Sequence, residues 1–109
     1  AVRWLSEVMA DARRIAETSA GFGLFGSAIA ATWLYQGMSD KVRFFVDEDP
    51  QRIGRTHLGL PILAPIDVPP DSDVFVGISP ILSESLASRL SSGTRRFHAA
   101  RKSDAWTVA

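Results

Sequence analysis

Residues 21–49, GFGLFGSAIAATWLYQGMSDKVRFFVDED, decide the fold. The segment opens with an apolar run at 21–25, which is bounded by glycines and too short for a helix. Such a run is typical of a strand buried on both faces. A glycine turn, a helix over 28–36 that stops at Gly37, and a second strand at 42–46 follow. This order predicts a parallel strand–helix–strand unit.

The flanking sequence continues the alternation of helix and strand. Apolar residues at steps of three and four predict an amphipathic helix over 2–17. The prolines and glycines of 51–70 predict a long loop, with a short extended piece at 60–63. Three further elements are expected: a strand at 73–78, a helix at 81–90 after a turn at Ser79-Pro80, and a strand at 96–100.

These elements predict one α/β domain over residues 1–109, with a small Rossmann-like, three-layer architecture. We expect about four parallel strands, helices on both faces and strand 21–25 in the centre. The expected organisation is a leading helix (2–17), a strand–turn–helix–strand core (21–50), a loop (51–70), a second strand–helix–strand half (73–100) and a tail (101–109).

Composition excludes several classes of function. Twelve basic residues balance twelve acidic ones, so no charge favours nucleic acid or an anionic membrane. The absence of cysteine excludes disulfides and thiolate chemistry, and the two histidines have no metal-like spacing, so we expect no metal. Residues 18–39 carry no charge, but glycines and polar residues interrupt them, so we expect no membrane span and a cytoplasmic protein. A start at Ala-Val without a signal peptide favours processing or a piece of a longer protein.

The glycines spell a dinucleotide-binding fingerprint, Gly21-x-Gly23-x-x-Gly26. The fingerprint requires a strand before its first glycine, whereas here the strand contains the glycines. The tight turn is therefore predicted at Gly26, and Ala28 replaces the glycine that approaches a pyrophosphate. Asp47 ends the next strand, where such folds place a ribose-binding acid. Two interpretations stay open: a site for a nucleotide, sugar or phosphate group, and glycines that only permit close packing.

Several motifs together resemble a known family. They are FGSAIAATWL at 25–34, FFVDEDP at 44–50, RIGR at 52–55, LGLPI at 58–62, and Pro65. In this order they resemble the C-terminal, Rossmann-like domain of SAM-dependent sugar C-methyltransferases, over about residues 2–90. The family's lysine after the Gly-Ala turn is absent, because Ala30 and Ala31 stand there.

The resemblance implies a domain that binds a nucleotide-sugar substrate and catalyses nothing alone. SAM would belong to an upstream methyltransferase domain of the parent protein, and no cofactor is expected in this one. The alternative is a stand-alone Rossmann-like domain that binds a nucleotide for regulation or serves protein interaction.

The predicted site lies beyond the carboxyl ends of the strands, where open α/β sheets bind ligands. Asp47 is a candidate for a ribose hydroxyl or for a turn, and Arg52 and Arg55 are candidates for clamping a phosphate or for an exposed loop surface. No serine has a nearby His–acid pair, so no catalytic residue is predicted. The predicted binding residues are Gly26, Ser27, Ala28, Asp47, Asp49, Arg52, Arg55, Ser79 and Pro80.

Overall fold

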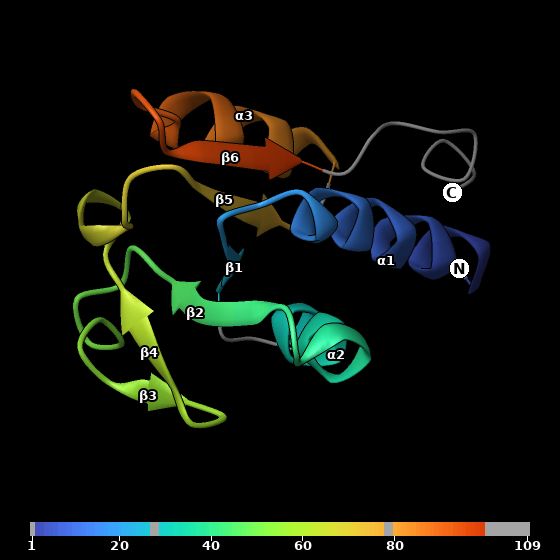
Figure 1. Cartoon of the computed structure of the whole chain (residues 1–109), viewed down its shortest axis with the longest axis horizontal. Helices are drawn as coiled ribbons and strands as arrows, with labels where there is room; N and C mark the ends of the chain where they lie inside the picture. The colour runs from blue at the N-terminus through green and yellow to red at the C-terminus, as the bar shows by residue number, and fades with distance from the viewer. Residues whose placement is uncertain (1, 27–28, 78–79, 100–109) are drawn as a thin grey trace.

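The computed structural model describes residues 2–26, 29–77 and 80–99. Three α-helices and six strands make up this part of the chain (Figure 1). They are α1 (Val2–Glu17), β1 (Gly21–Phe25), α2 (Ile29–Met38), β2 (Val42–Val46), β3 (Thr56–His57), β4 (Leu60–Leu63), the 3₁₀ turn η1 (Pro65–Asp67), β5 (Ser72–Val76), α3 (Pro80–Leu90) and β6 (Arg96–Ala99).

The six strands form one mixed sheet in the order β3-β4-β2-β1-β5-β6. All neighbours are parallel except β3 and β4, which are antiparallel. Without β3, the parallel strands lie in the chain order third, second, first, fourth, fifth, which is the order of a doubly wound sheet. The architecture is therefore α/β and compatible with a small Rossmann-like domain, with β1 central as predicted.

The prediction of about four strands was wrong, since the sheet has six. The segment expected as a loop, 51–70, contains β3, β4 and η1, and β4 spans the extended piece that was predicted at 60–63. Leu58 and Gly59 both have left-handed φ angles, 52° and 82°, and fold the chain into a tight hairpin. β4 then adds to the edge of β2 as another parallel strand, with Phe45 opposite Ile62. This pairing was not predictable from the sequence, since Pro61 lies inside β4 and proline is unusual in the middle of a strand.

Two hydrophobic cores lie on opposite faces of the sheet. Residues of α1 and α2 pack over one face, which includes Phe22 and Phe45. Residues of α3 pack over the other, which includes Phe44 and Val46. The alternation of Phe44, Phe45 and Val46 between the cores follows from the two-residue period of a strand. The predicted three layers thus have their physical basis in a sheet that buries both faces.

Two glycines have packing roles that the sequence did not reveal. A β-carbon at Gly23 would lie 2.2 Å from Cε1 of Phe44, so the buried ring occupies the space that a side chain would need. Gly37 was predicted to stop the second helix, but α2 continues to Met38, and the Met9 side chain packs against Gly37 instead. Both glycines therefore allow close approach between elements.

Candidate functional site

The carboxyl ends of β1 and β5 form the point where the strand order reverses, which is where doubly wound folds bind ligands. A glycine follows each strand directly: Gly26 after β1 and Gly77 after β5. Gly26 has a φ of 89°, which only glycine adopts readily, and a β-carbon there would meet nothing within 4 Å. The predicted tight turn at Gly26 is confirmed by this φ angle. Gly77, by contrast, lies close to Leu34 of α2.

Asp47 begins the loop that leaves β2 beside this turn. The Gly26 N–H donates to the Val46 carbonyl at 2.6 Å, and the Asp47 N–H donates to the Leu63 carbonyl at 3.0 Å. These two bonds fix the ends of β1, β2 and β4 relative to one another. Asp47 Oδ1 accepts the Asp49 N–H at 2.9 Å, so one carboxylate oxygen forms an Asx turn. The sequence left a ligand-binding and a turn role open, and the turn is present.

Arg52 lies between the two predicted carboxylates. Its Nη1 is 3.7 Å from Asp47 Oδ2, and its Nε is 3.8 Å from Asp49 Oδ2. Asp49 also accepts the Gln51 N–H at 2.9 Å through Oδ1. The Asp47 side chain is only 14% exposed, whereas those of Arg52 and Asp49 are about half exposed, at 50% and 48%. The loop therefore presents a half-exposed arginine beside two acids.

The structure brings only part of the predicted site together. Arg52 lies within ion-pair distance of both Asp47 and Asp49. Gly26 is joined to this group by its hydrogen bond to the carbonyl of Val46, the residue before Asp47. Arg55 instead donates from Nε to the Gln51 carbonyl at 2.7 Å. Pro80 is the first residue of α3, as its position after a turn predicts. The remaining predicted residues, Ser27, Ala28 and Ser79, lie outside the described residues.

Glu48 joins the loop after β2 to α3, the helix on the face of the sheet opposite α1 and α2. Its carboxylate accepts two hydrogen bonds from the Arg89 guanidinium of α3, at 2.8 and 2.9 Å. These bonds lower the pKa of Glu48 below its usual value. Both side chains are well exposed, so the pair contributes more to the placement of the loop than to stability.

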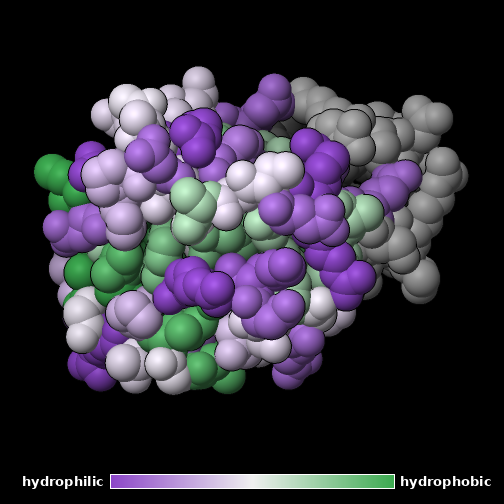
Figure 2. Space-filling view, in the orientation of Figure 1, coloured by the Kyte–Doolittle hydropathy of each residue, from purple (hydrophilic) through white to green (hydrophobic). Residues whose placement is uncertain are grey.

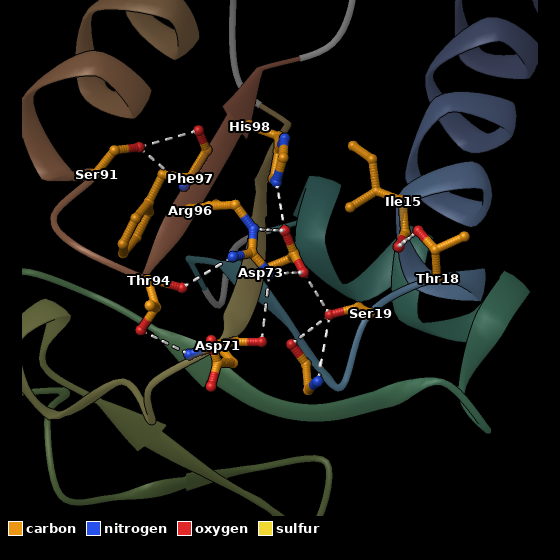
Figure 3. A network of polar contacts seen from close by, with 11 residues as sticks. Ile15, Thr18, Ser19, Asp71, Asp73, Ser91, Thr94, Arg96, Phe97 and His98 are labelled. Carbon is orange, nitrogen blue, oxygen red and sulfur yellow. Dashed lines mark hydrogen bonds and ion pairs between the residues drawn. The ribbon is translucent and has the colours of Figure 1, made fainter.

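A polar cluster that the sequence did not predict surrounds Asp73 at the amino end of β5 (Figure 3). Arg96 donates to both carboxylate oxygens, from Nε to Oδ1 at 2.8 Å and from Nη2 to Oδ2 at 3.1 Å. His98 Nε2 lies 2.7 Å from Oδ1, and Ser19 Oγ lies 2.7 Å from Oδ2. The cluster thus joins Ser19, in the segment between α1 and β1, to β5 and β6.

Asp73 is almost fully buried, with 9% of its side chain exposed. Burial by itself raises the pKa of the Asp73 carboxyl, but hydrogen bonds from Arg96, Ser19 and His98 outweigh burial and lower that pKa to about 2. Ser19 lies against the carboxylate rather than the imidazole, so the arrangement differs from a nucleophile–His–acid triad. His98 thus has a structural role, since it joins β6 to the carboxylate of β5. The signal available in the sequence was the Arg96-x-His98 spacing, which places both side chains on one face of β6.

A cavity of about 210 Å³ lies away from the predicted site. It is lined by Arg13, Glu17, Gly37, Met38, Asp40 and Lys41, near the ends of α1 and α2. Arg13 donates from Nη2 to the Gly37 carbonyl at 2.7 Å, and the Lys41 N–H donates to the Met38 carbonyl at 2.9 Å. Two of its lining residues therefore satisfy the last carbonyl groups of α2, which is the work of a helix C-cap.

Comparison with known proteins identifies no relative: no protein-family model, curated protein or solved structure matches this chain. Among residues 2–26, 29–77 and 80–99, no group of three or more His, Asp or Glu side chains is placed to hold a metal ion. No helix within these residues has the length and apolar character needed to cross a membrane. The class of protein is therefore defined by the fold alone, an α/β domain with a six-stranded mixed sheet.

Proposed function

We propose that this chain is a binding domain for a nucleotide-type small molecule and that it has no catalytic activity alone. The observation that carries the proposal is the Gly26 turn, a left-handed glycine at the end of the central strand with no atom of the described residues within 4 Å of the position that a β-carbon would take. Asp47 directly follows the adjacent strand, one residue beyond the carbonyl that accepts the Gly26 N–H. A glycine turn and an acid on neighbouring strands at a switch point are the two parts that bind the phosphate and ribose of nucleotides.

The charges of the loop support a ligand that has both hydroxyl and phosphate groups. The Asp47 carboxylate accepts hydrogen bonds from ribose hydroxyls, and the planar Arg52 guanidinium pairs with phosphate oxygens. Arg52 is half exposed and lies 3.7 and 3.8 Å from the two acids, so a phosphate bound beside this loop could reach its guanidinium. A nucleoside diphosphate sugar combines these groups, and it is the substrate class that the C-methyltransferase resemblance implies.

The wider assignment rests on that resemblance. We propose that the chain acts as the substrate-binding C-terminal domain of a C-methyltransferase-like protein, with SAM bound by an upstream domain. A stand-alone nucleotide-binding regulatory domain is the second candidate, because the Gly26–Asp47 arrangement serves NAD equally well. The identity of the ligand distinguishes the two.

Ligand-induced stabilisation tests the proposal. Thermal unfolding is measured with dTDP-sugars, UDP-sugars, NAD, SAM and CoA, followed by calorimetric titration of any ligand that stabilises. A ligand at one hundred times its dissociation constant stabilises by about 2.7 kcal/mol, which is roughly 10 °C or more for a domain of this size. Stabilisation by nucleotide sugars supports the first assignment, and stabilisation by NAD alone supports the second.

Asp47→Asn is the matched perturbation, since it keeps the shape and the turn-forming oxygen. We expect affinity for the stabilising ligand to fall at least tenfold, or about 1.4 kcal/mol. Asp67→Asn, in the exposed η1 turn, is the control and leaves affinity unchanged. Equal affinities for wild type and Asp47→Asn exclude Asp47 from the site, and no stabilisation by any ligand excludes the binding function.

A further inference from the structure

The loop after β2, residues 47–55, owes its shape to hydrogen bonds within itself and to β4. The Asp49 and Gln51 N–H groups each donate at 2.9 Å to the carboxylate two residues earlier in the chain. The Gly54 N–H donates to the Ile62 carbonyl of β4 at 3.0 Å. These bonds fix the conformation of the loop, but none of them joins it to α3.

Glu48 supplies a contact between this loop and α3. Its Oε1 accepts a hydrogen bond from Arg89 Nη2 at 2.8 Å, and its Oε2 accepts one from Nη1 at 2.9 Å. Two parallel bonds between planar groups fix the orientation of the groups as well as their distance. Glu48 is also the residue between Asp47 and Asp49, so a shift of Glu48 displaces both acids of the proposed site.

The helix that carries Arg89 is itself fixed on the sheet. α3 begins at Pro80, after the turn that leaves β5, and has Arg89 in its last turn, about 14 Å further along the helix axis. Leu86, Ala87 and Leu90 of the same helix pack in the core on this face of the sheet. α3 therefore provides a firm attachment point, with one end near the switch point and the other bound to the loop after β2.

We propose that Arg89 is a positioning residue for the proposed ligand site. Through Glu48 it holds the loop after β2 against α3, and this sets where Asp47 and Arg52 meet a ligand. The hydrogen bonds of Arg89 go to Glu48 and not to Asp47 or Arg52, so its effect on the site passes through Glu48. The inference rests on the proposed function for its ligand, whereas the placement of the loop is measurable without one.

The exposure of the pair sets the size of the expected effect. The side chains of Arg89 and Glu48 are 56% and 41% exposed. Figure 2 shows mostly white and purple atoms at the top of the molecule, over α3 and β6, which agrees with a polar surface in contact with water. Loss of an exposed ion pair changes an equilibrium by up to about fivefold, so we expect effects of about threefold that disappear in high salt.

Amide hydrogen exchange measured by NMR tests the placement of the loop without a ligand. We expect the Asp49 and Gln51 amides to exchange about threefold faster in Arg89→Gln than in the wild type, because the loop is no longer held at Glu48. Arg43→Gln is the matched control, since Arg43 is an exposed arginine of β2 that donates to the Asp40 carbonyl at 3.0 Å. It leaves both rates unchanged. Wild-type rates in Arg89→Gln overturn the proposal.

Calorimetric titration with UDP-glucose and with NAD tests the effect on the site. It is done at 25 °C on folded protein, so a loss of stability alone does not change the affinity. For a ligand that binds, we expect Arg89→Gln and Glu48→Gln each to weaken affinity about threefold. The double variant is no weaker than either single variant, because both substitutions remove the same pair.

Glu48→Gln also separates positioning from charge. Arg89 offsets one of three consecutive acidic charges, at 47–49, and acidic charges repel a phosphate. If charge alone acts, Glu48→Gln tightens binding while Arg89→Gln weakens it, and this result overturns the positioning role. Binding of neither ligand contradicts the proposed function, and the exchange rates then decide the role of Arg89 by themselves.

Discussion

Alanine at position 23 is expected to destabilise the protein by about 1–2.5 kcal/mol. The added β-carbon would lie 2.2 Å from Cε1 and 2.5 Å from Cδ1 of Phe44, whereas favourable carbon contacts lie near 3.5–4.0 Å. The Phe44 ring must therefore move by more than about 1 Å inside a core where it is only 4% exposed. Overpacking costs about 1–3 kcal/mol, and the movement of a buried aromatic ring places this case in the upper part of that range, at about 2–3 kcal/mol. The lower chain entropy of alanine offsets about 0.5–1 kcal/mol, which leaves about 1–2.5 kcal/mol.

Urea unfolding followed by circular dichroism measures the loss, and the domain should melt at least 4 °C lower. Gly37→Ala is a close control, because its β-carbon would lie 2.4 Å from the end of the flexible Met9 side chain, which can move away. Alanine also favours the helix at that position, so we expect Gly37→Ala to be neutral or stabilising. Phe44→Leu removes the ring edge, and Gly23→Ala should cost less in that background than in the wild type.

Three results would refute this reasoning. A Gly23→Ala protein as stable as the wild type would show that Phe44 repacks freely. Equal losses for Gly23→Ala and Gly37→Ala would show that the identity of the contacting side chain does not matter. Additive effects of Gly23→Ala and Phe44→Leu would mean that the two residues are not coupled, and that the glycine is required for another reason.

Two further predictions concern the ion pairs. The folded pKa of Asp73 is about 2, below the ordinary 3.8, so its stabilisation is complete above about pH 4 and is lost as the pH falls through 2. We expect about 1–2 kcal/mol of acid-sensitive stability, measured by urea unfolding between pH 5 and pH 2, because exposed Arg96 and His98 are partly screened. An Asp73→Asn variant with the same acid dependence as the wild type would contradict this assignment. Glu48→Gln should leave the melting temperature unchanged in high salt, and a clear loss there would mean that the exposed Arg89 pair is a major stabilising contact.

The elements with strong periodicity were predictable, and those that depend on distant contacts were not. The helix over 2–17 and the strands at 21–25 and 42–46 were confirmed, because their patterns are local. β4 was missed as a strand of the main sheet, since its pairing with β2 depends on a left-handed leucine that no propensity favours.

The candidate site was predictable in position but less so in its contacts. The turn at Gly26 followed from its place after a strand, and its φ of 89° confirms it. The Arg52 contacts with two acids depend on the fold of the loop and could not be read from the spacing. Asp73 was overlooked because one buried acid looks like the polar start of a strand, while Ser19 and Arg96 lie 54 and 23 residues away from it.

The two ends of the sheet are held by different kinds of contact. The Asp73 cluster joins the segment after α1 to β5 and β6 near the amino ends of the strands. The loops at the carboxyl ends of the strands are held by backbone hydrogen bonds and exposed ion pairs. Substitutions in the loop after β2 consequently alter few buried contacts. Such a scaffold can be diversified at one end while the other end keeps it folded, so recognition can evolve, or be engineered, at positions 47–55 without rebuilding the domain.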